Sequence, residues 1–411
     1  MKKREADVCV IGGGAAGMLA AGMAAQRGYK VLLFEKNQFT GKKLRITGKG
    51  RCNVTNDSSV QDVLDNITAN SRFMYSSLNG FSPRDVMAFF ESLGVPLKTE
   101  RGQRVFPQSD RAEDIVNALR GFMQKSGVKV VYEAVTDIKT QDGHVTAVVT
   151  KQSEAACGGV ILCTGGLSYP LTGSTGDGYE IAKRLGHTVT ELKPSLVPLE
   201  CKQSFCRDLT GLSLKNVTFS VFDGKGKRLY SELGEMMFTH FGITGPLVLS
   251  ASAHLRDYSR GYYGLIDMKP ALDEKKLDQR ILRDFEKYSN KTINNALIEL
   301  LPRSMIPIVT MLAGIPHETK VHDITKAQRT SLVNTVKGIR IDIAQPRPID
   351  EAIVTSGGVS VREVNPTTME SKKVSGLYFA GEILDVDAYT GGFNLQIAWS
   401  TAYAAGNNVN I

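Results

Sequence analysis

The stretch from Ala6 to Lys36 constrains the fold most, because it has the order strand, glycine turn, helix, strand. An apolar run over 7–11 predicts a buried parallel strand, and small residues over 15–26 predict a tightly packed helix. Between them stand Gly12, Gly14 and Gly17 in the spacing G-x-G-x-x-G. This spacing suits a tight turn, the approach of a pyrophosphate to the backbone, and close packing of the helix on the strand.

The second strand, over 31–34, ends in Glu35. A carboxylate at this point can accept hydrogen bonds from both ribose hydroxyls of an adenosine and would repel a 2′-phosphate. The alternative is a glycine turn in an ordinary α/β domain. Because the motif, its flanking elements and the acid occur together, we expect a dinucleotide site.

The length of 411 residues allows two or three domains, and the net charge of +8 raises the question of nucleic acid. Six cations fall between 36 and 51 with no acid among them: Lys36, Lys42, Lys43, Arg45, Lys49 and Arg51. A bound dinucleotide explains part of this cluster, and RNA is the alternative. The helix-like stretch 273–291 mixes six bases with five acids, so a continuous basic face is not indicated there. We therefore do not favour a nucleic-acid partner.

The N-terminus could be mistaken for a signal peptide, because a basic start precedes an uncharged run over 8–25. The dinucleotide motif accounts for that run, so we expect neither export nor membrane insertion. The six cysteines include no C-x-x-C and no zinc spacing, which indicates free thiols in a reducing cytoplasm and no metal site.

The remainder of the first domain alternates helices and strands. A polar, glycine-rich loop over 47–53 is a candidate ligand-binding segment. Helices are predicted over 83–93 and 111–126. Strands are predicted over 129–138 and 145–150, with a turn at 141–143, and over 159–163, where the strand ends in Thr164-Gly165-Gly166.

The pattern changes near residue 193. Short alternating segments over 196–201, 217–222, 229–231 and 246–250 predict an antiparallel sheet or small barrel. Helical periodicity follows over 273–336, and a strand returns over 338–343. The C-terminal segment resembles the first domain again: a strand over 376–382, a loop, and a small-residue helix over 395–406 opened by Gly391-Gly392. These patterns predict one cofactor domain in two parts, 1–192 and 355–411. Its insert would consist of a β-rich domain, 193–270 with 337–354, and a helical domain, 271–336. We expect the insert to wall a substrate cleft.

Several motifs together resemble the BaiN-like family of bacterial FAD-dependent, NAD(P)H-linked oxidoreductases. They are GGGAAG with Glu35, TGKGRCNVTN at 47–56, FGITGP at 241–246, TSGGVSV at 355–361, and GLYFAGEILDVDAYTGGFNLQIAWSTAYAAG at 376–406. The resemblance covers essentially the whole chain. It implies a glutathione-reductase-type, Rossmann-like FAD-binding domain interrupted by a β pseudo-barrel and a helical bundle.

The resemblance also assigns cofactor contacts. The diphosphate would meet Gly12, Gly14, Ala15 and Ala16, the adenosine ribose Glu35 and Lys36, and the adenine the backbone of Val135. Arg51, Cys52 and Asn53 would line the flavin, with Thr164 and Gly165 beside the cofactor. Gly381 and Glu382 would reach the ribityl and phosphate region. Gly392, Phe393, Asn394 and Leu395 would present backbone N–H groups to the pyrimidine edge, which carries negative charge in the reduced flavin. The alternative is that 391–406 only packs against the sheet.

The expected activity is hydride transfer from NAD(P)H through FAD to a hydrophobic small molecule, with reduction of a conjugated C=C bond in a 3-oxo steroid or bile-acid-like enone as the specific hypothesis. A second G-x-G-x-x-G is lacking, so NAD(P)H would bind transiently or another donor would serve. Catalytic residues are not identified; Tyr169, His240 and Tyr389 are candidate proton donors by residue type alone. The alternatives are a flavoprotein that modifies a tRNA base and a non-catalytic flavin-binding module. The oligomeric state is left open.

Overall fold

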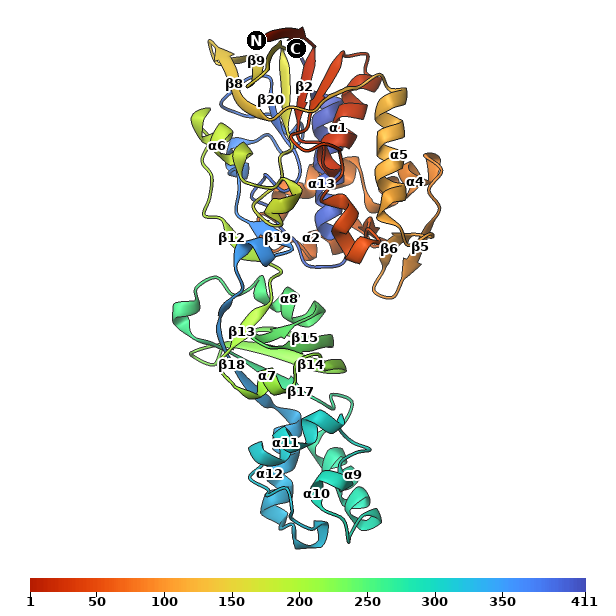
Figure 1. Ribbon diagram of the computed structural model, residues 1–411, viewed down its shortest axis with the longest axis vertical. Coiled ribbons are helices and arrows are strands. Elements are labelled where there is room, and N and C mark those ends of the chain that lie inside the picture. The colour runs from red at the N-terminus through yellow and green to blue at the C-terminus, as the bar shows by residue number, and fades with distance from the viewer. The chain divides into compact units, whose positions relative to one another are not determined.

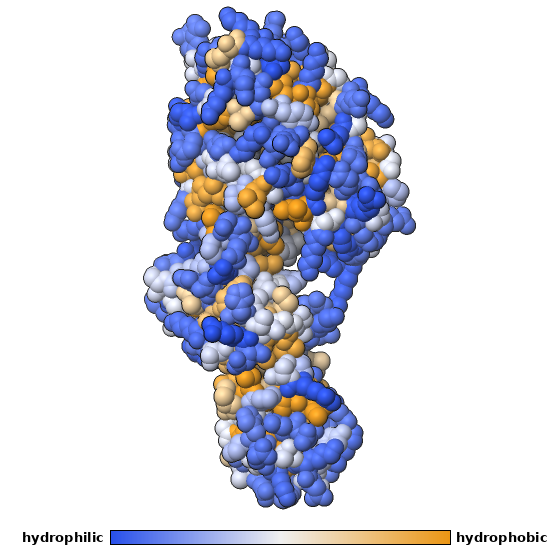
Figure 2. All heavy atoms as spheres, in the orientation of Figure 1, coloured by the Kyte–Doolittle hydropathy of each residue, from blue (hydrophilic) through white to orange (hydrophobic).

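The computed structural model describes residues 1–411 and divides the chain into two units. Unit 1 comprises Met1–Ser195 and Ile349–Ile411, and unit 2 comprises Leu196–Pro348. Each unit has its own hydrophobic core, and the two clusters of buried residues share no member. Both chain ends lie in unit 1 (Figure 1). Hydrophilic residues cover most of the visible face of unit 1, with hydrophobic residues in small groups (Figure 2).

A five-stranded parallel sheet forms the centre of unit 1, in the order β20-β11-β2-β3-β7. Its strands are β20 (Leu377–Phe379), β11 (Gly159–Leu162), β2 (Val8–Ile11), β3 (Val31–Phe34) and β7 (Lys129–Val131). Every residue of β2 and β3 is buried, as expected for parallel strands covered on both faces. The sheet and its crossover helix confirm the predicted Rossmann-like fold.

Glycines set how closely the main helices of unit 1 pack. They are α1 (Ala15–Gln26), α5 (Ala112–Lys125) and α13 (Phe393–Asn408). A side chain at Gly406 of α13 would lie 2.7 Å from the Ala20 carbonyl oxygen and from Met23 Cβ, both on α1. A side chain at Gly22 would collide with the ring of Phe122 on α5. The first and last helices of the chain are therefore in direct contact (Figure 1).

Smaller sheets and helices complete unit 1. A four-stranded sheet has the order β1-β10-β9-β8 and a three-stranded one the order β4-β6-β5. Their strands are β1 (Lys2–Glu5), β10 (Ser153–Ala156), β9 (His144–Thr150), β8 (Val135–Gln141), β4 (Thr55–Asn56), β6 (Arg104–Pro107) and β5 (Leu97–Glu100). The remaining helices are α2 (Val60–Asp65), α3 (Tyr75–Gly80), α4 (Pro83–Ser92) and α6 (Asp177–Arg184).

Unit 2 combines a closed barrel with helices. The barrel order is β13-β16-β15-β14-β17-β18. Its strands are β13 (Leu199–Cys201), β16 (Gly242–Thr244), β15 (Arg228–Thr239), β14 (Ser213–Asp223), β17 (Tyr262–Asp267) and β18 (Ile339–Pro346). The helices are α7 (Phe205–Asp208), α8 (Pro246–Ser252), α9 (Glu274–Lys287), α10 (Ile293–Ala296), α11 (Ile306–Leu312) and α12 (Lys326–Lys337).

Two strands lie where the chain passes between the units. The strands β12 (Lys193–Ser195) and β19 (Val354–Ser356) pair antiparallel, with Ser195 opposite Val354. Both strands, and residues 349–353 before β19, belong to unit 1 rather than to the insert.

Three predicted segments differ from the structure. The segment 246–250 is not a strand: it begins helix α8, with Pro246 at the first position, where its missing N–H leaves no hydrogen bond unmade. The predicted strand 129–138 is two strands, β7 and β8, which join different sheets. The predicted strand 196–201 starts only at Leu199, because Leu196 has the left-handed φ of 55°.

Candidate functional site

The glycine turn after β2 has the geometry that its spacing predicts. Gly12 has φ 103°, and a Cβ there would lie 2.5 Å from the carbonyl oxygen of Cys163. A Cβ at Gly17 would run into the carbonyl oxygen of Gly12. A Cβ at Gly14 would meet no atom within 4 Å. The turn is therefore closed against the protein at Gly12 and Gly17 and open at Gly14, where a ligand can approach the backbone.

Two helices begin in this region without a side-chain cap. Helix α1 starts after Gly14 and helix α13 starts after Gly392. Neither helix has an acidic residue in its first turn. The N–H groups of Ala15 and Ala16, and those of Phe393, Asn394 and Leu395, therefore lie at the positive ends of their helix dipoles, which attract anions.

Glu35 is buried and joins the glycine turn to the end of β3. Its Oε2 accepts a hydrogen bond from the Gly13 N–H at 2.8 Å, and its Oε1 accepts from the backbone and side-chain N–H groups of Asn37, both at 2.7 Å. A carboxylate offers about four lone-pair sites, so it keeps room for a further donor such as a hydroxyl.

The Lys36 side chain has two partners in the structure. Its Nζ lies 2.6 Å from Asp177 Oδ2 and also donates to Thr175 Oγ1. Asn37 donates to the carbonyl oxygen of Thr172 at 3.0 Å. Lys36 and Asn37 thus connect the segment 172–177 to the end of β3, and one of the three Nζ donors of Lys36 remains for a further acceptor.

The segment 47–53 is an irregular loop, as predicted. It overlaps the end of the 3₁₀ segment Leu44–Gly50, whose residues 47–49 have non-helical backbone angles. Gly48, Lys49, Gly50 and Cys52 all have φ between 56° and 85°, a conformation that costs a non-glycine residue about 1 kcal/mol or more. Burial raises the pKa of the Cys52 thiol to about 12, against a partial lowering by its hydrogen bond to Thr47. The thiol therefore stays protonated at neutral pH and is no nucleophile.

The Arg51 guanidinium contacts two carboxylates and an aromatic ring. It forms ion pairs of 2.5 Å with Glu100 and Asp110 and stacks on Phe106 with 4.0 Å between the Cζ atom and the ring centroid. Lys98 completes this charged group through Asp110, at 2.7 Å.

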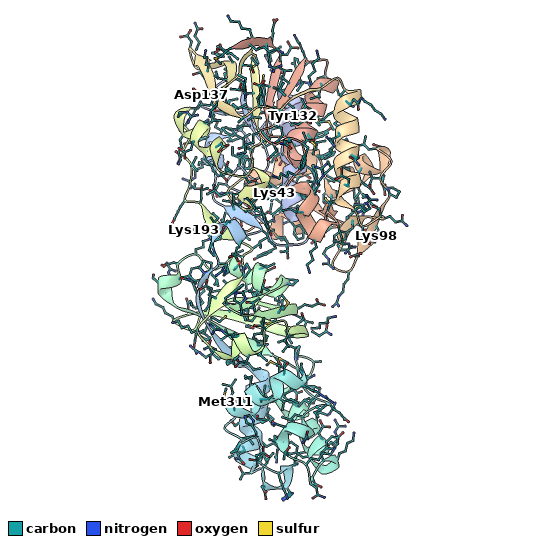
Figure 3. The ribbon with its side chains drawn as sticks, in the orientation of Figure 1. Lys43, Lys98, Tyr132, Asp137, Lys193 and Met311 are labelled. Atoms are coloured by element: carbon teal, nitrogen blue, oxygen red, sulfur yellow. The ribbon has the colours of Figure 1, made fainter.

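The basic cluster over 36–51 is largely neutralised in three dimensions. Besides the pairs of Lys36 and Arg51, Arg45 pairs with Glu113 at 2.5 Å and Lys43 with Glu382 at 2.7 Å. Figure 3 shows Lys43 over the middle of unit 1 and Lys98 at its margin, beside β5 and β6. The cluster is therefore no continuous basic surface.

The ends of β11 and β20 meet at a half-buried polar group around Glu382. Its Oε2 accepts from Lys43 Nζ, and its Oε1 accepts from Ser168 Oγ and from the Thr355 N–H, both at 3.0 Å. The Lys43, Ser168 and Thr355 contacts escaped prediction because they come from three distant segments. The Glu382 carboxylate thus accepts from three donors of the chain, as that of Glu35 does.

Gly381 and Gly165 bring the backbone close to the glycine turn. Gly381 has φ 80°, and a side chain there would lie 2.9 Å from Ala16 Cβ. Gly165, after Thr164, has φ 72°. The hydroxyl of Thr164 and the side-chain oxygen of Asn53 are buried without any hydrogen-bond partner, which is rare unless a ligand or water supplies one.

The loop before α13 contains a buried acid that sequence reasoning missed. Asp387 is 2% exposed, and its carboxylate accepts from Ser195 Oγ at 2.7 Å and Ser356 Oγ at 3.1 Å. Asn394 braces the same loop, because its side chain bonds both the N–H and the carbonyl of Ala388. Asn394 therefore has its backbone N–H, not its amide, available at the start of α13.

The other predicted residues lie as follows. Val135 is half-buried at the start of β8, opposite Thr150. Among the candidate proton donors, Tyr169 has the left-handed φ of 53° before the 3₁₀ turn Pro170–Thr172. Tyr389 is held by its backbone N–H to Asn66, and His240 belongs to unit 2, with its ring against Phe241.

These features fit FAD. The open backbone at Gly14 and the positive start of α1 suit a diphosphate, Glu35 suits a ribose, and the positive start of α13 suits an electron-rich ring edge. The fold and this arrangement define the class: an FAD-binding, Rossmann-type oxidoreductase.

The family model described as "HI0933-like protein Rossmann domain" matches residues 6–408. The chain belongs to this family, which confirms the resemblance drawn from its motifs.

Three relatives align over nearly their whole length. The 3-dehydro-bile acid delta(4,6)-reductase of Clostridium scindens is 30% identical over 406 residues, 97% of each chain. The ribosomal RNA dihydrouridine synthases of Escherichia coli and Haemophilus influenzae are 29% and 30% identical, with 98% of each chain covered. Among solved structures, the 3-ketosteroid delta1-dehydrogenase of Sterolibacterium denitrificans aligns with a TM-score of 0.54, 14% identity and 99% of each chain covered, which shows the shared fold.

Two findings concern other kinds of site. No group of three or more His, Cys, Asp or Glu side chains is placed to hold a metal ion. No helix combines the length and the apolar character required to cross a membrane.

Proposed function

We propose that this protein is an FAD-dependent reductase that adds a hydride and a proton across a C=C bond conjugated with a carbonyl group. The observation that carries the proposal is the pair of uncapped helix starts, at Gly14 and Gly392, together with Gly381 and the half-buried polar group of Glu382. NAD(P)H is the proposed donor, oxidised as the C=C bond is reduced.

The proposed cofactor contacts are those that the family resemblance implies, and the open backbone at Gly14 and the uncapped starts of α1 and α13 support them. Gly12, Gly14, Ala15 and Ala16 would hold the diphosphate through backbone N–H groups, with Glu35 on the ribose and the Val135 backbone at the adenine. The backbones of Arg51, Cys52, Thr164, Gly165, Gly381 and Glu382, with the side chain of Asn53, would line the middle of the cofactor. Gly392, Phe393, Asn394 and Leu395 would bond the pyrimidine edge.

Bound FAD would supply the hydride-transfer chemistry itself. The chain's own contribution is then to hold the acceptor and to stabilise charge. The first turn of α13 places three N–H groups and a positive dipole end where negative charge would be stabilised. The buried carboxylate of Asp387 fixes the loop that leads into this turn through Ser195 and Ser356.

The names of the relatives support the reaction class. A 3-oxo steroid with Δ4,6 unsaturation and the uracil ring of a uridine both carry a C=C bond conjugated with a carbonyl. A steroid or bile-acid-like enone is the first candidate acceptor. A uridine in RNA is the second candidate, because the two synthases resemble this chain as closely as the bile-acid enzyme does.

The test is anaerobic. Mass spectrometry of the cofactor released from the purified protein should give FAD; release of FMN alone would contradict the proposal. The protein, reduced with NADH or NADPH, should then be re-oxidised by a 3-oxo-Δ4 or Δ4,6 steroid or by a uridine-containing RNA, with the saturated product found by mass spectrometry. Re-oxidation by none of these acceptors faster than in buffer would refute the reaction class.

A further inference from the structure

Unit 2 carries most of the excess positive charge of the chain. Residues 196–348 contain 22 Lys and Arg against 16 Asp and Glu, so six of the eight net positive charges lie there. The helical stretch 273–291, where sequence reasoning looked for a basic face, contributes little, because Arg280 and Lys287 are paired with Asp284 and Glu299.

An exposed basic turn joins β14 to β15. Lys225, Lys227 and Arg228 are all exposed, and none of the three side chains forms an ion pair. The nearest carboxylate along the chain, that of Asp223, bonds the backbone of the turn and not the cationic side chains. Its Oδ1 accepts hydrogen bonds from the N–H groups of Lys225 and Lys227 at 3.0 and 2.9 Å. The carboxylate therefore shapes the turn, and the cations point into solvent.

Aromatic rings lie beside this turn on the outer face of the barrel. Phe222 and Tyr263 are cross-strand neighbours on β14 and β17, and their rings are stacked, with 5.2 Å between centroids and 10° between planes. Arg340 of β18 stacks on Tyr263 at 4.0 Å while it pairs with Asp342. Both rings are half-buried and lie on the outside of the barrel, on the same face as Ser220 and the half-buried Leu265.

We propose that this surface, the hairpin face (Phe222, Lys225, Lys227, Arg228, Tyr263 and Arg340), binds single-stranded RNA. Unpaired cations attract the phosphates, and stacked rings with an arginine offer a platform for bases, which is how proteins bind single strands without sequence preference. The choice of RNA rests on the second candidate acceptor of the proposed function, while the location rests on the contacts above.

The binding test uses the FAD-loaded full-length protein and a fluorescein-labelled oligouridylate of about 20 nucleotides. Fluorescence anisotropy gives the Kd at salt concentrations between about 50 and 200 mM. The triple variant Lys225→Ala/Lys227→Ala/Arg228→Ala should weaken binding at least about tenfold and reduce the slope of log K against log salt by about 2, since each phosphate contact of a single strand contributes about 0.7. Phe222→Leu should weaken binding about tenfold by removing a stacking surface.

The matched control removes three other exposed cations of unit 2 that form no ion pair: Arg303→Ala/Lys320→Ala/Lys326→Ala. This variant should bind the oligouridylate as the unchanged protein does. Equal weakening by both triple variants would overturn the proposal, because attraction would then be diffuse. Absence of RNA binding by the unchanged protein would also overturn it. So would a light-scattering result in which the unchanged protein self-associates and the hairpin variant does not, because this face would then be a contact between copies of the chain.

The outcome is separable from that of the proposed function. The hairpin variants should reduce a soluble steroid enone at the unchanged rate, and thermal melting should show that they fold. RNA binding at the hairpin face without reduction of any conjugated C=C bond would leave this inference standing and refute the proposed function. Enone reduction without RNA binding would support the proposed function and refute this inference.

Discussion

At the scale of single residues, Glu35 connects the glycine turn to the end of β3, and we propose that it also binds the ribose of FAD. Both of its oxygens accept charge-assisted hydrogen bonds, from Gly13 and from Asn37. We expect Glu35→Ala to weaken FAD binding about tenfold to a hundredfold, because hydrogen bonds to charged groups contribute roughly 1.5–3 kcal/mol. Fluorescence titration of the apoprotein measures this. Glu154→Ala, which removes a partly exposed acid paired with Lys139, is the control, and unchanged affinity of the Glu35 variant would place the ribose elsewhere.

His187 is a buried residue whose charge state should affect stability. Burial lowers its pKa below the ordinary value of 6.5; the nearby Glu363 carboxylate opposes this shift, and Lys373 adds to it. As the pH falls below 6.5, the unfolded chain therefore takes up a proton that the folded protein resists, so stability is lost in this direction by up to about 1.4 kcal/mol per pH unit. NMR titration of the His187 ring, assigned by its loss in His187→Gln, should give a pKa below 6.5.

The same variant tests the consequence for stability. Urea unfolding at pH 7 and pH 5 should show a smaller loss for His187→Gln than for the unchanged protein, although the variant starts lower because Ser371 and Glu363 lose a partner. An equal loss in both proteins would contradict the role given to His187.

At the scale of elements, two glycines of α13 differ in their surroundings: Gly392 precedes the helix and Gly406 lies near its end. Substitutions at the two positions can therefore be compared directly. Gly392 has φ 102°, and a side chain there would run into the Thr55 carbonyl, at the start of the helix. Gly406 lies near the other end, against Ala20 and Met23 of α1. We expect Gly392→Ala to lower the FAD content of the purified protein, because the first turn of α13 must shift.

Gly406→Ala should leave the FAD content unchanged and lower stability by about 1–3 kcal/mol through overpacking. Absorbance at the flavin band and thermal melting distinguish the two effects. Equal FAD loss in both variants would mean that the start of α13 has no special part in cofactor binding.

The sequence predicts those elements whose structure depends on local patterns of hydrophobic residues and glycines. Hydrophobic runs and glycine spacing predict the strands β2 and β3, the helix α1 and the tight turn with Gly12, Gly14 and Gly17. The segment 246–250 was misread because a short apolar run is compatible with a strand or a buried helix. The ion pairs of Lys36 and Arg51 cannot be predicted from local patterns, because their acidic partners, Asp177, Glu100 and Asp110, come from segments 49 to 141 residues away. Such pairs depend on the fold, which no local pattern encodes.

At the scale of the whole molecule, the two units have separate cores. The paired strands β12 and β19 bring together the two segments of unit 1 on either side of the insert. We expect a variant in which a short Gly-Ser linker replaces residues 196–348 to fold and retain FAD. Absorbance and mass spectrometry of the released cofactor measure this. A folded variant without FAD would show that unit 2 is required for cofactor binding.

Because β20 and α13 follow the insert in the chain, synthesis on the ribosome imposes an order on assembly. All of unit 2 is made before the edge strand and the helix that complete unit 1. A nascent chain therefore exposes the glycine turn early, but offers the second helix start only after α13, the last of the described elements, has emerged. We therefore expect the cofactor to be bound firmly only after α13 has emerged and packed against α1.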